Sequence, residues 1–146
     1  MTETPISVTE EVVVVAVDPV GVQGPRGPQG VRGPVGTQPV FSRAGMLFEQ
    51  ESPSRFYIDQ ATTIAKVRIS VGTPPVGGFV VVDVNKNGTS VFTNQNNRPK
   101  IAAGEYTDAA IPDITSLVPG DYLTVDIDSV GTTDPGADLT VSVTLA

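Results

Sequence analysis

The side chains best suited to catalysis in this sequence are two carboxylates, Asp126 and Asp128. Two residues apart in an extended strand, they would share one face with their Cα atoms roughly 7 Å apart, a separation that glycoside hydrolysis tolerates. The simpler alternative is that they form the solvated face of that strand, opposite Lys66 and Arg68. Because the sequence has no histidine and no cysteine, Ser-His-Asp triads, cysteine nucleophiles and ordinary zinc sites are excluded. We therefore predict no catalytic residue and no enzyme activity.

The same stretch raises the question of a calcium site, because residues 126–131 resemble the start of an EF-hand loop. The match fails at Val130, which stands at the fifth position of that loop. It fails again at Ala137, which stands where the bidentate glutamate belongs. A looser site that uses Asp134 or Asp138 stays open as an alternative. We predict neither a metal ion nor a cofactor.

Asparagines offer a second kind of chemistry, the recognition of sugars, because an amide presents both donors and acceptors to hydroxyl groups. All five asparagines lie between positions 85 and 97. A predicted strand over 88–93 would hold their two groups about 20 Å apart. The alternative is that asparagine only serves the turns there. The second group and the arginine after it are the candidate glycan contacts: Asn94, Gln95, Asn96, Asn97 and Arg98.

Strands must position these candidates, because residues 39–146 show period-two hydrophobicity and no sustained helical period. Apolar and polar residues alternate over 65–71, 123–127 and 139–145. Asn87-Gly88 predicts a tight hairpin turn. Further strands are expected over 46–49, 55–58, 79–84, 89–93 and 101–106. About eight strands at this spacing predict a β-sandwich head domain with a jelly-roll-like topology.

The segment 21–38 carries glycine at every third position: Gly21, Gly24, Gly27, Gly30, Gly33 and Gly36. Only glycine fits at the axis where three polyproline-II chains wind together. The pattern therefore predicts a short collagen-like triple-helical stalk, and hence a homotrimer. A plain extended linker is the alternative. Ordering costs about 1–2 kcal/mol per residue, so a stalk this short needs a trimeric neighbour to hold its strands together.

The segment 1–20 contains an apolar, β-branched run between acidic residues. Such a run is typical of a strand that is buried on both faces, yet no neighbouring segment can pair with it. We expect it to dock into another protein by strand addition, or to pair with its own copies. The predicted docking residues are Val12, Val13, Val14, Val15 and Val17.

Charge and hydropathy exclude two classes of partner. The formal net charge is −7, and no segment has the basic face that a phosphate backbone demands, so nucleic-acid binding is not expected. The longest apolar stretch, 12–17, is far below membrane-spanning length, so membrane insertion is not expected. The N-terminus lacks the basic start and apolar core of a signal peptide, which predicts synthesis in a cytoplasm.

A family resemblance rests on the stalk motif GPRGPQG joined to a β-domain that contains VDVNKNGT, NNRPKIAAG and PGDYLTVDID. This combination resembles collagen-like virion fibre and minor tail proteins of tailed bacteriophages, especially those of actinobacterial hosts. It covers residues 21–146. The resemblance implies a homotrimeric structural protein, held to the virion by its N-terminus, whose distal β-domain faces the host. Large tail fibres have a long shaft and this chain has none, which leaves a short capsid-decorating fibre as an alternative.

Several functions stay open at this point. The expected one is a virion fibre with three parts: an anchor at 1–20, a stalk at 21–38, and an adhesive head at 39–146. Its partners would be its own copies, other virion proteins and a host-surface glycan. The alternative is a purely architectural decoration or cement protein of the capsid or tail. A bacterial collagen-like surface protein and a glycan-degrading enzyme are less favoured.

Overall fold

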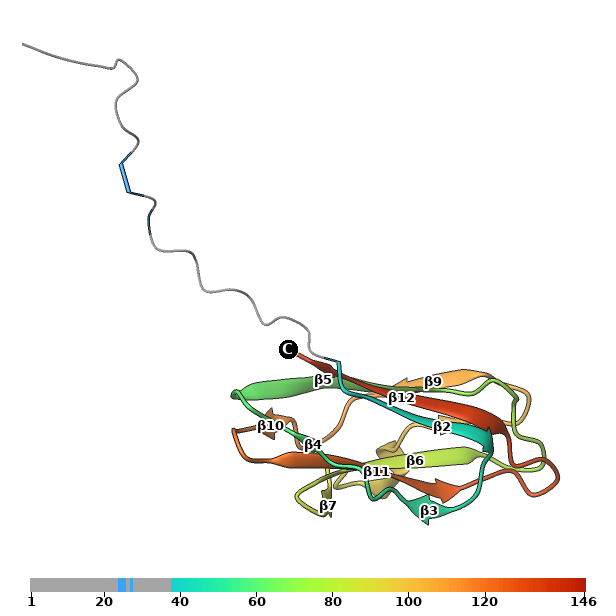
Figure 1. Cartoon of the computed structure of the whole chain (residues 1–146). Helices are drawn as coiled ribbons and strands as arrows, with labels where there is room; N and C mark the ends of the chain where they lie inside the picture. The colour runs from blue at the N-terminus through green and yellow to red at the C-terminus, as the bar shows by residue number, and fades with distance from the viewer. Residues whose placement is uncertain (1–23, 26, 28–37) are drawn as a thin grey trace, which may run out of the picture. The chain divides into compact units, whose positions relative to one another are not determined.

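The computed structural model describes residues 24, 25, 27 and 38–146 (Figure 1). The predicted docking valines and four of the six repeat glycines lie outside these residues, so the docking strand and the triple helix stay predictions. At Gly24 and Gly27 an added Cβ would meet no other atom within 4 Å.

The described strands form two antiparallel sheets. The first has two long central strands, with one strand along one edge and two short strands sharing the other edge. In order across the sheet, the strands are β2 (Val40–Met46), β12 (Ala137–Leu145) and β5 (Thr62–Ser70), and then β9 (Thr107–Ala110) and β10 (Ser116–Leu117).

The second sheet has a similar plan, with two central strands and a pair of short strands at each edge. Across it lie β3 (Gln50–Glu51) and β4 (Phe56–Tyr57), then β11 (Tyr122–Ser129) and β6 (Val80–Lys86), and then β7 (Thr89–Ser90) and β8 (Lys100–Ile101). A single 3₁₀ turn, η2 (Gln95–Asn97), lies between β7 and β8.

The core lies between the two sheets, which Figure 1 shows as two layers. Along β11, Leu123, Val125 and Ile127 are buried, and the residues between them are half-buried. β12 repeats this pattern with buried side chains at every second position from Leu139 to Leu145. Burial of one such side chain contributes about 1.5–3 kcal/mol. The all-β prediction is confirmed, and the architecture is that of a β-sandwich.

The alternation predicted over 65–71 fails at one residue. Ala65 was expected to face the core, but it is exposed, and Ile64 is buried instead. The reason is an irregularity in the pairing with β12, where Leu145 faces Ile64 and the preceding Thr144 faces Lys66. Ala65 is the extra residue of this bulge, and an extra residue reverses the faces on one side of it.

The predicted hairpin is confirmed. Asn87 and Gly88 both have positive φ, at 53° and 87°, as a two-residue type I′ turn requires, and Lys86 faces Thr89 across it. The following strand is shorter than predicted and ends at Ser90. Beyond it the chain leaves the sheet and buries the side chain of Phe92 completely.

Other boundaries also differ from the expectation. The strand predicted over 46–49 is absent, and β2 ends where it should begin. The strand predicted over 101–106 is reduced to β8, because the chain turns at Gly104, whose φ is 81°. β2 was missed because five of its seven residues are exposed and its sequence has no alternation.

Candidate functional site

Polar side chains gather on the outer face of the second sheet. Tyr122, Thr124 and Asp126 point away from the core because side chains alternate along β11 and the residues between them are buried. β6 contributes Asn85, which lies directly opposite Thr124. Two adjacent strands thus bring an aromatic ring, a hydroxyl, an amide and a carboxylate onto one surface.

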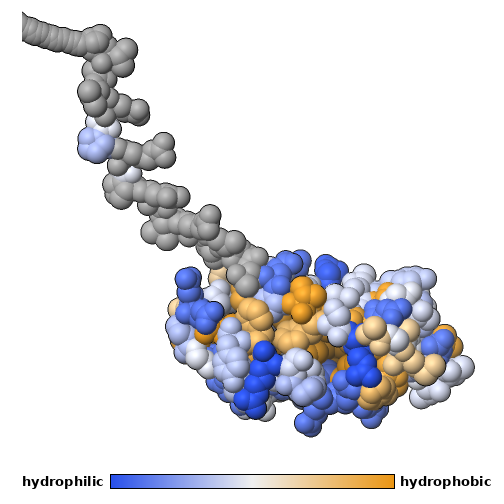
Figure 2. Space-filling view, in the orientation of Figure 1, coloured by the Kyte–Doolittle hydropathy of each residue, from blue (hydrophilic) through white to orange (hydrophobic). Residues whose placement is uncertain are grey.

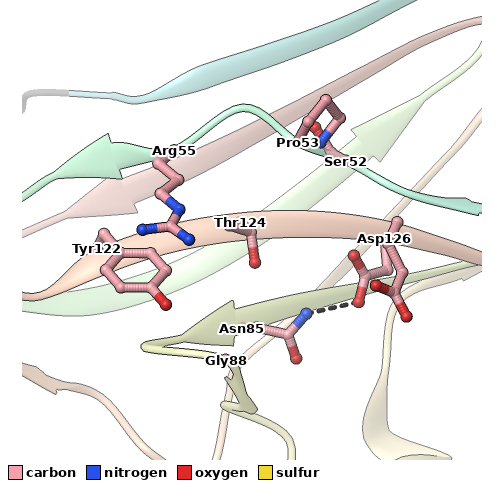
Figure 3. Close-up of a pocket in the computed structure, with 9 residues that line it drawn as sticks. Ser52, Pro53, Arg55, Asn85, Gly88, Tyr122, Thr124 and Asp126 are labelled. Carbon is pink, nitrogen blue, oxygen red and sulfur yellow. Dashed lines mark hydrogen bonds between the residues drawn. The ribbon is translucent and has the colours of Figure 1, made fainter.

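These side chains line an open hollow of about 260 Å³ (Figure 3). β11 and β6 supply one side of it, and the segment 51–55, which links β3 to β4, supplies another. The polar groups that line it are Glu51, Arg55, Asn85, Tyr122, Thr124 and Asp126. The hollow is open to solvent and lined mainly by groups that form hydrogen bonds.

One hydrogen bond orders the acidic end of the hollow. Asn85 Nδ2 donates to Asp126 Oδ2 at 2.6 Å (Figure 3). Within the described residues, no protein group is hydrogen-bonded to Asn85 Oδ1 or to Asp126 Oδ1. The pair therefore presents two oxygen acceptors, already oriented, to anything that enters the hollow.

The aromatic end is formed by Tyr122. The Arg55 guanidinium lies 4.3 Å from the centroid of its ring, and the ring of Tyr57 lies 5.6 Å away at a tilt of 49°. A cation over an exposed ring is worth only about 0.5–1 kcal/mol. A flat ligand can therefore displace Arg55 from the ring at small cost and gain a new hydrogen-bond donor beside it.

The backbone of Tyr122 is held by the hairpin turn. Its N–H donates to Asn87 Oδ1 at 3.0 Å, and its carbonyl accepts from the Asn87 N–H at 2.9 Å. Asn87 Nδ2 in turn donates to Asp121. The Val118 N–H, the Asn87 amide and the nearby Lys86 ammonium hold the pKa of Asp121 below its usual range. The turn predicted from sequence therefore also positions the aromatic residue of the site.

A row of three carboxylates crosses the same face. Asp126 of β11 faces Glu51 of β3 on one side and Asp83 of β6 on the other. Like charges directly opposite each other destabilise a sheet. Asp83 is buried, and this burial raises the pKa of its carboxyl, even though Ser90 Oγ donates to it. The face is acidic and favours neutral or cationic ligands over anionic ones.

The candidate glycan contacts predicted from sequence lie close to this face, but their side chains mostly serve the fold. Asn94 Oδ1 accepts from the Asn96 N–H and caps η2. Gln95 Nε2 donates to Phe92 O at 2.7 Å and to Ser90 Oγ at 3.0 Å. The contact with Ser90 shows that the loop folds back onto β7. The strand over 88–93 on which the predicted separation of about 20 Å depended is therefore absent beyond Ser90.

The remaining two contacts of this loop are also structural. Asn97 Nδ2 donates to Asp113 at 3.4 Å. The Arg98 guanidinium pairs with Asp128, and its Nε donates to Gln95 O at 2.7 Å. Within the described residues, Asn96 is the member of the group for which no side-chain hydrogen bond is found.

The expectation that Asp126 and Asp128 lie opposite basic residues of a neighbouring strand is wrong, because the two pairs are in different sheets. Lys66 and Arg68 lie on β5 in the first sheet, whereas Asp126 and Asp128 lie on β11 in the second. Arg98 pairs with Asp128 instead. The sequence does not show this pairing because it depends on the loop that carries Arg98.

The structure also shows the two residues of the looser calcium site considered above, Asp134 and Asp138. Asp134 Oδ1 accepts from the Gly136 N–H in a local turn. Asp138 Oδ1 accepts from the Gly45 N–H and joins β12 to β2. Within residues 24, 25, 27 and 38–146, no group of three or more acidic side chains is arranged to hold a metal ion.

Sequence reasoning did not identify the hollow. The alternation over 122–127 was visible and marks Tyr122, Thr124 and Asp126 as one face. The strands expected over 55–58 and 79–84 are present as β4 and β6. The sequence gives no signal for β3, which is two residues long, nor for the pairing of these strands with β11.

Comparison with protein-family models, curated proteins and solved structures finds no match for this chain. In the described part of the chain, no helix is long and apolar enough to cross a membrane.

Proposed function

We propose that this chain is a bacteriophage virion structural protein, a short homotrimeric fibre anchored by its N-terminus, whose β-sandwich head binds a host-surface glycan. The anchoring and the trimer rest on the sequence of residues 1–38. The glycan-binding part rests on one structural observation, the hollow on the outer face of the second sheet.

The groups in the hollow fit a sugar. Asn85 and Asp126 present oriented acceptors for adjacent hydroxyls, Arg55 supplies donors, and the Tyr122 ring offers an apolar face for sugar C–H groups. The row of carboxylates formed by Glu51, Asp126 and Asp83 makes the site selective for the charge of the glycan. It favours a neutral or amino-substituted glycan over one that carries uronate or phosphate.

The strand order supports a jelly-roll head. When each pair of short edge strands is counted as one position, each sheet has four positions. The chain visits β2, then β3 and β4, then β5, and changes sheet at each step. It then forms a hairpin from β6 to β7 and changes sheet again before each of β9, β11 and β12. Eight positions in two interlocking Greek keys are the plan of a jelly roll.

The test is binding of the full-length chain to a glycan array that contains neutral, amino and acidic oligosaccharides. We expect binding to neutral or amino sugars, and a loss of tenfold or more for Tyr122→Ala and for Asp126→Ala. Tyr106→Ala is the control, because Tyr106 is also a tyrosine with an accessible ring, at 58% exposure, and does not line the hollow. Equal binding by all variants would contradict the proposed site.

A second candidate, a purely architectural decoration or cement protein, is favoured by a different observation. In the loop from Asn94 to Arg98, all side chains except that of Asn96 form hydrogen bonds or an ion pair within the head. This arrangement suits a rigid head with no ligand. The same array distinguishes the two. No binding to any glycan, combined with particles that lose integrity without the protein, would favour the architectural role.

A further inference from the structure

β2 is an edge strand whose second edge has no partner strand within the described residues. Its pairing with β12 covers one side only. Apolar side chains are exposed at both of its ends, with Val40 at 56% and Met46 at 72%, and Phe48 beyond it at 48%. Figure 2 shows apolar surface at the centre of the side of the head that carries β2. Such an edge is a template for another chain.

The usual protections of an edge strand are weak here. Proline and lysine are absent between Val40 and Leu47, and Arg43 is the one charged residue. Its guanidinium lies 4.1 Å from the centroid of the Phe48 ring and donates to Gln50 Oε1 at 2.6 Å. The Arg43 side chain is therefore directed toward β3 and does not cover the free edge of β2. A bulge distorts only the far end of the strand, where β2 has one residue more than β12 between Arg43 and Met46 and the Asp138 carboxylate of β12 accepts the Gly45 N–H.

The outer face beside this edge is suited to close approach. β2 contributes Ser42 and Ala44, and β12 contributes Thr140, Ser142 and Thr144, all outside the core. These side chains are small and uncharged, so a second surface can approach β2 itself without desolvating a charge. The charges that β5 adds to this face are Lys66 and Arg68, which lie opposite Thr144 and Ser142 on the far side of β12.

The chain path links this edge to the stalk. The repeat ends at Gln38, and β2 begins two residues later. The junction is held against β12, since the Val143 N–H donates to Pro39 O at 3.0 Å and Gln38 Nε2 donates to Thr144 Oγ1 at 3.2 Å. No free spacer separates the last triplet from the strand. Three chains that wind on one axis must therefore bring three copies of Val40 together.

The geometry points to β2, with the outer face of β12 beside it, as the surface through which the three heads contact one another. The partner is a second copy of this chain. This inference rests on the proposed homotrimer and adds to it the face that meets the three-fold axis.

Single cysteines test the contact, because the natural chain has none. Ala44 lies about 14 Å along the strand from Val40, so a cross-link there reports the packing of the heads and not merely the end of the stalk. We expect full-length Ala44→Cys or Ser42→Cys to form a disulfide-linked dimer under mild oxidation at low chain concentration. Ile111→Cys, at a residue that is 70% exposed just after β9 on the other edge of the sheet, should stay unlinked.

The native mass of the unoxidised chain separates the outcomes. A trimer with cross-links at 42 or 44 supports the interface. A trimer that cross-links at 111 but at neither 42 nor 44, or at none of the three, overturns the interface and leaves the proposed fibre standing. A monomer overturns both.

Discussion

Two long loops at one end of the head pack against each other, residues 71–79 between β5 and β6 and residues 130–136 between β11 and β12. Substitution of Gly131 by alanine is the sharpest test of this packing. Gly131 lies between β11 and β12 and packs against the loop that carries Val76. An added Cβ would stand 2.0 Å from Asp134 O and 2.7 Å from Val76 O. Both neighbours are backbone atoms, so they move only if the bridge between Val76 and Asp134 opens.

The cost follows from the bonds in that bridge. The Val76 N–H donates to Asp134 O at 2.8 Å, and Val76 O accepts from the N–H groups of Thr133 and Asp134 at 3.0 and 3.1 Å. A hydrogen bond contributes about 0.5–1.5 kcal/mol net, so loss of all three costs about 2–4 kcal/mol. For a domain of this size that corresponds to a fall in Tm of roughly 8–20 °C.

The free energy of unfolding is measured by urea titration of the full-length chain, with circular dichroism as the signal. Gly78→Ala is the matched control, since its Cβ would lie 3.6 Å from its nearest neighbour, Val130 O, which is an ordinary contact distance. Its free energy of unfolding should equal that of the natural chain or exceed it by up to about 1 kcal/mol. A free energy of unfolding for Gly131→Ala within about 0.5 kcal/mol of that of the control would refute the close packing of these loops.

Three further predictions concern buried groups. Because burial raises the pKa of Asp83, its ionisation lowers stability as pH rises above about 4, so Asp83→Asn should raise Tm at pH 7 and flatten that dependence in a thermal scan. Asp121 has the opposite sign, because its pKa is lowered. Its contribution is present at neutral pH and is lost as pH falls below about 4, and Asp121→Asn should lower Tm at pH 7 but show little difference in acid. Phe92 is fully buried, so Phe92→Ala should cost about 3–5 kcal/mol in urea unfolding, and a cost below 1 kcal/mol would contradict its place in the core.

The sequence predicted the parts of the fold that a single strand can encode. The alternation from Leu139 to Leu145 and the turn at Asn87-Gly88 are local patterns, and both are confirmed. The bulge at Ala65 depends on which strand pairs with β5, and β2 depends on an edge with few buried residues. Neither has a local signal.

The candidate site shows the same division. The outward face of β11 could be predicted, because its polar residues alternate with buried ones. Its neighbours could not, since Asn85, Glu51 and Arg55 reach the hollow only through the pairing of three other strands. The glycan contacts predicted over 94–98 stay a prediction. Amides that suit a sugar suit backbone groups equally well, and here the fold uses them.

The row of carboxylates across the second sheet gives the head a preference among ligands, and the melting temperature of the head can be used to detect a ligand that binds. Glu51 and Asp83 lie opposite Asp126 on its two neighbouring strands, so this face favours a ligand that donates hydrogen bonds or carries positive charge. Any ligand that binds only the folded head raises its melting temperature. A screen of soluble sugars by thermal shift can thus find the ligand without a labelled probe or a known host.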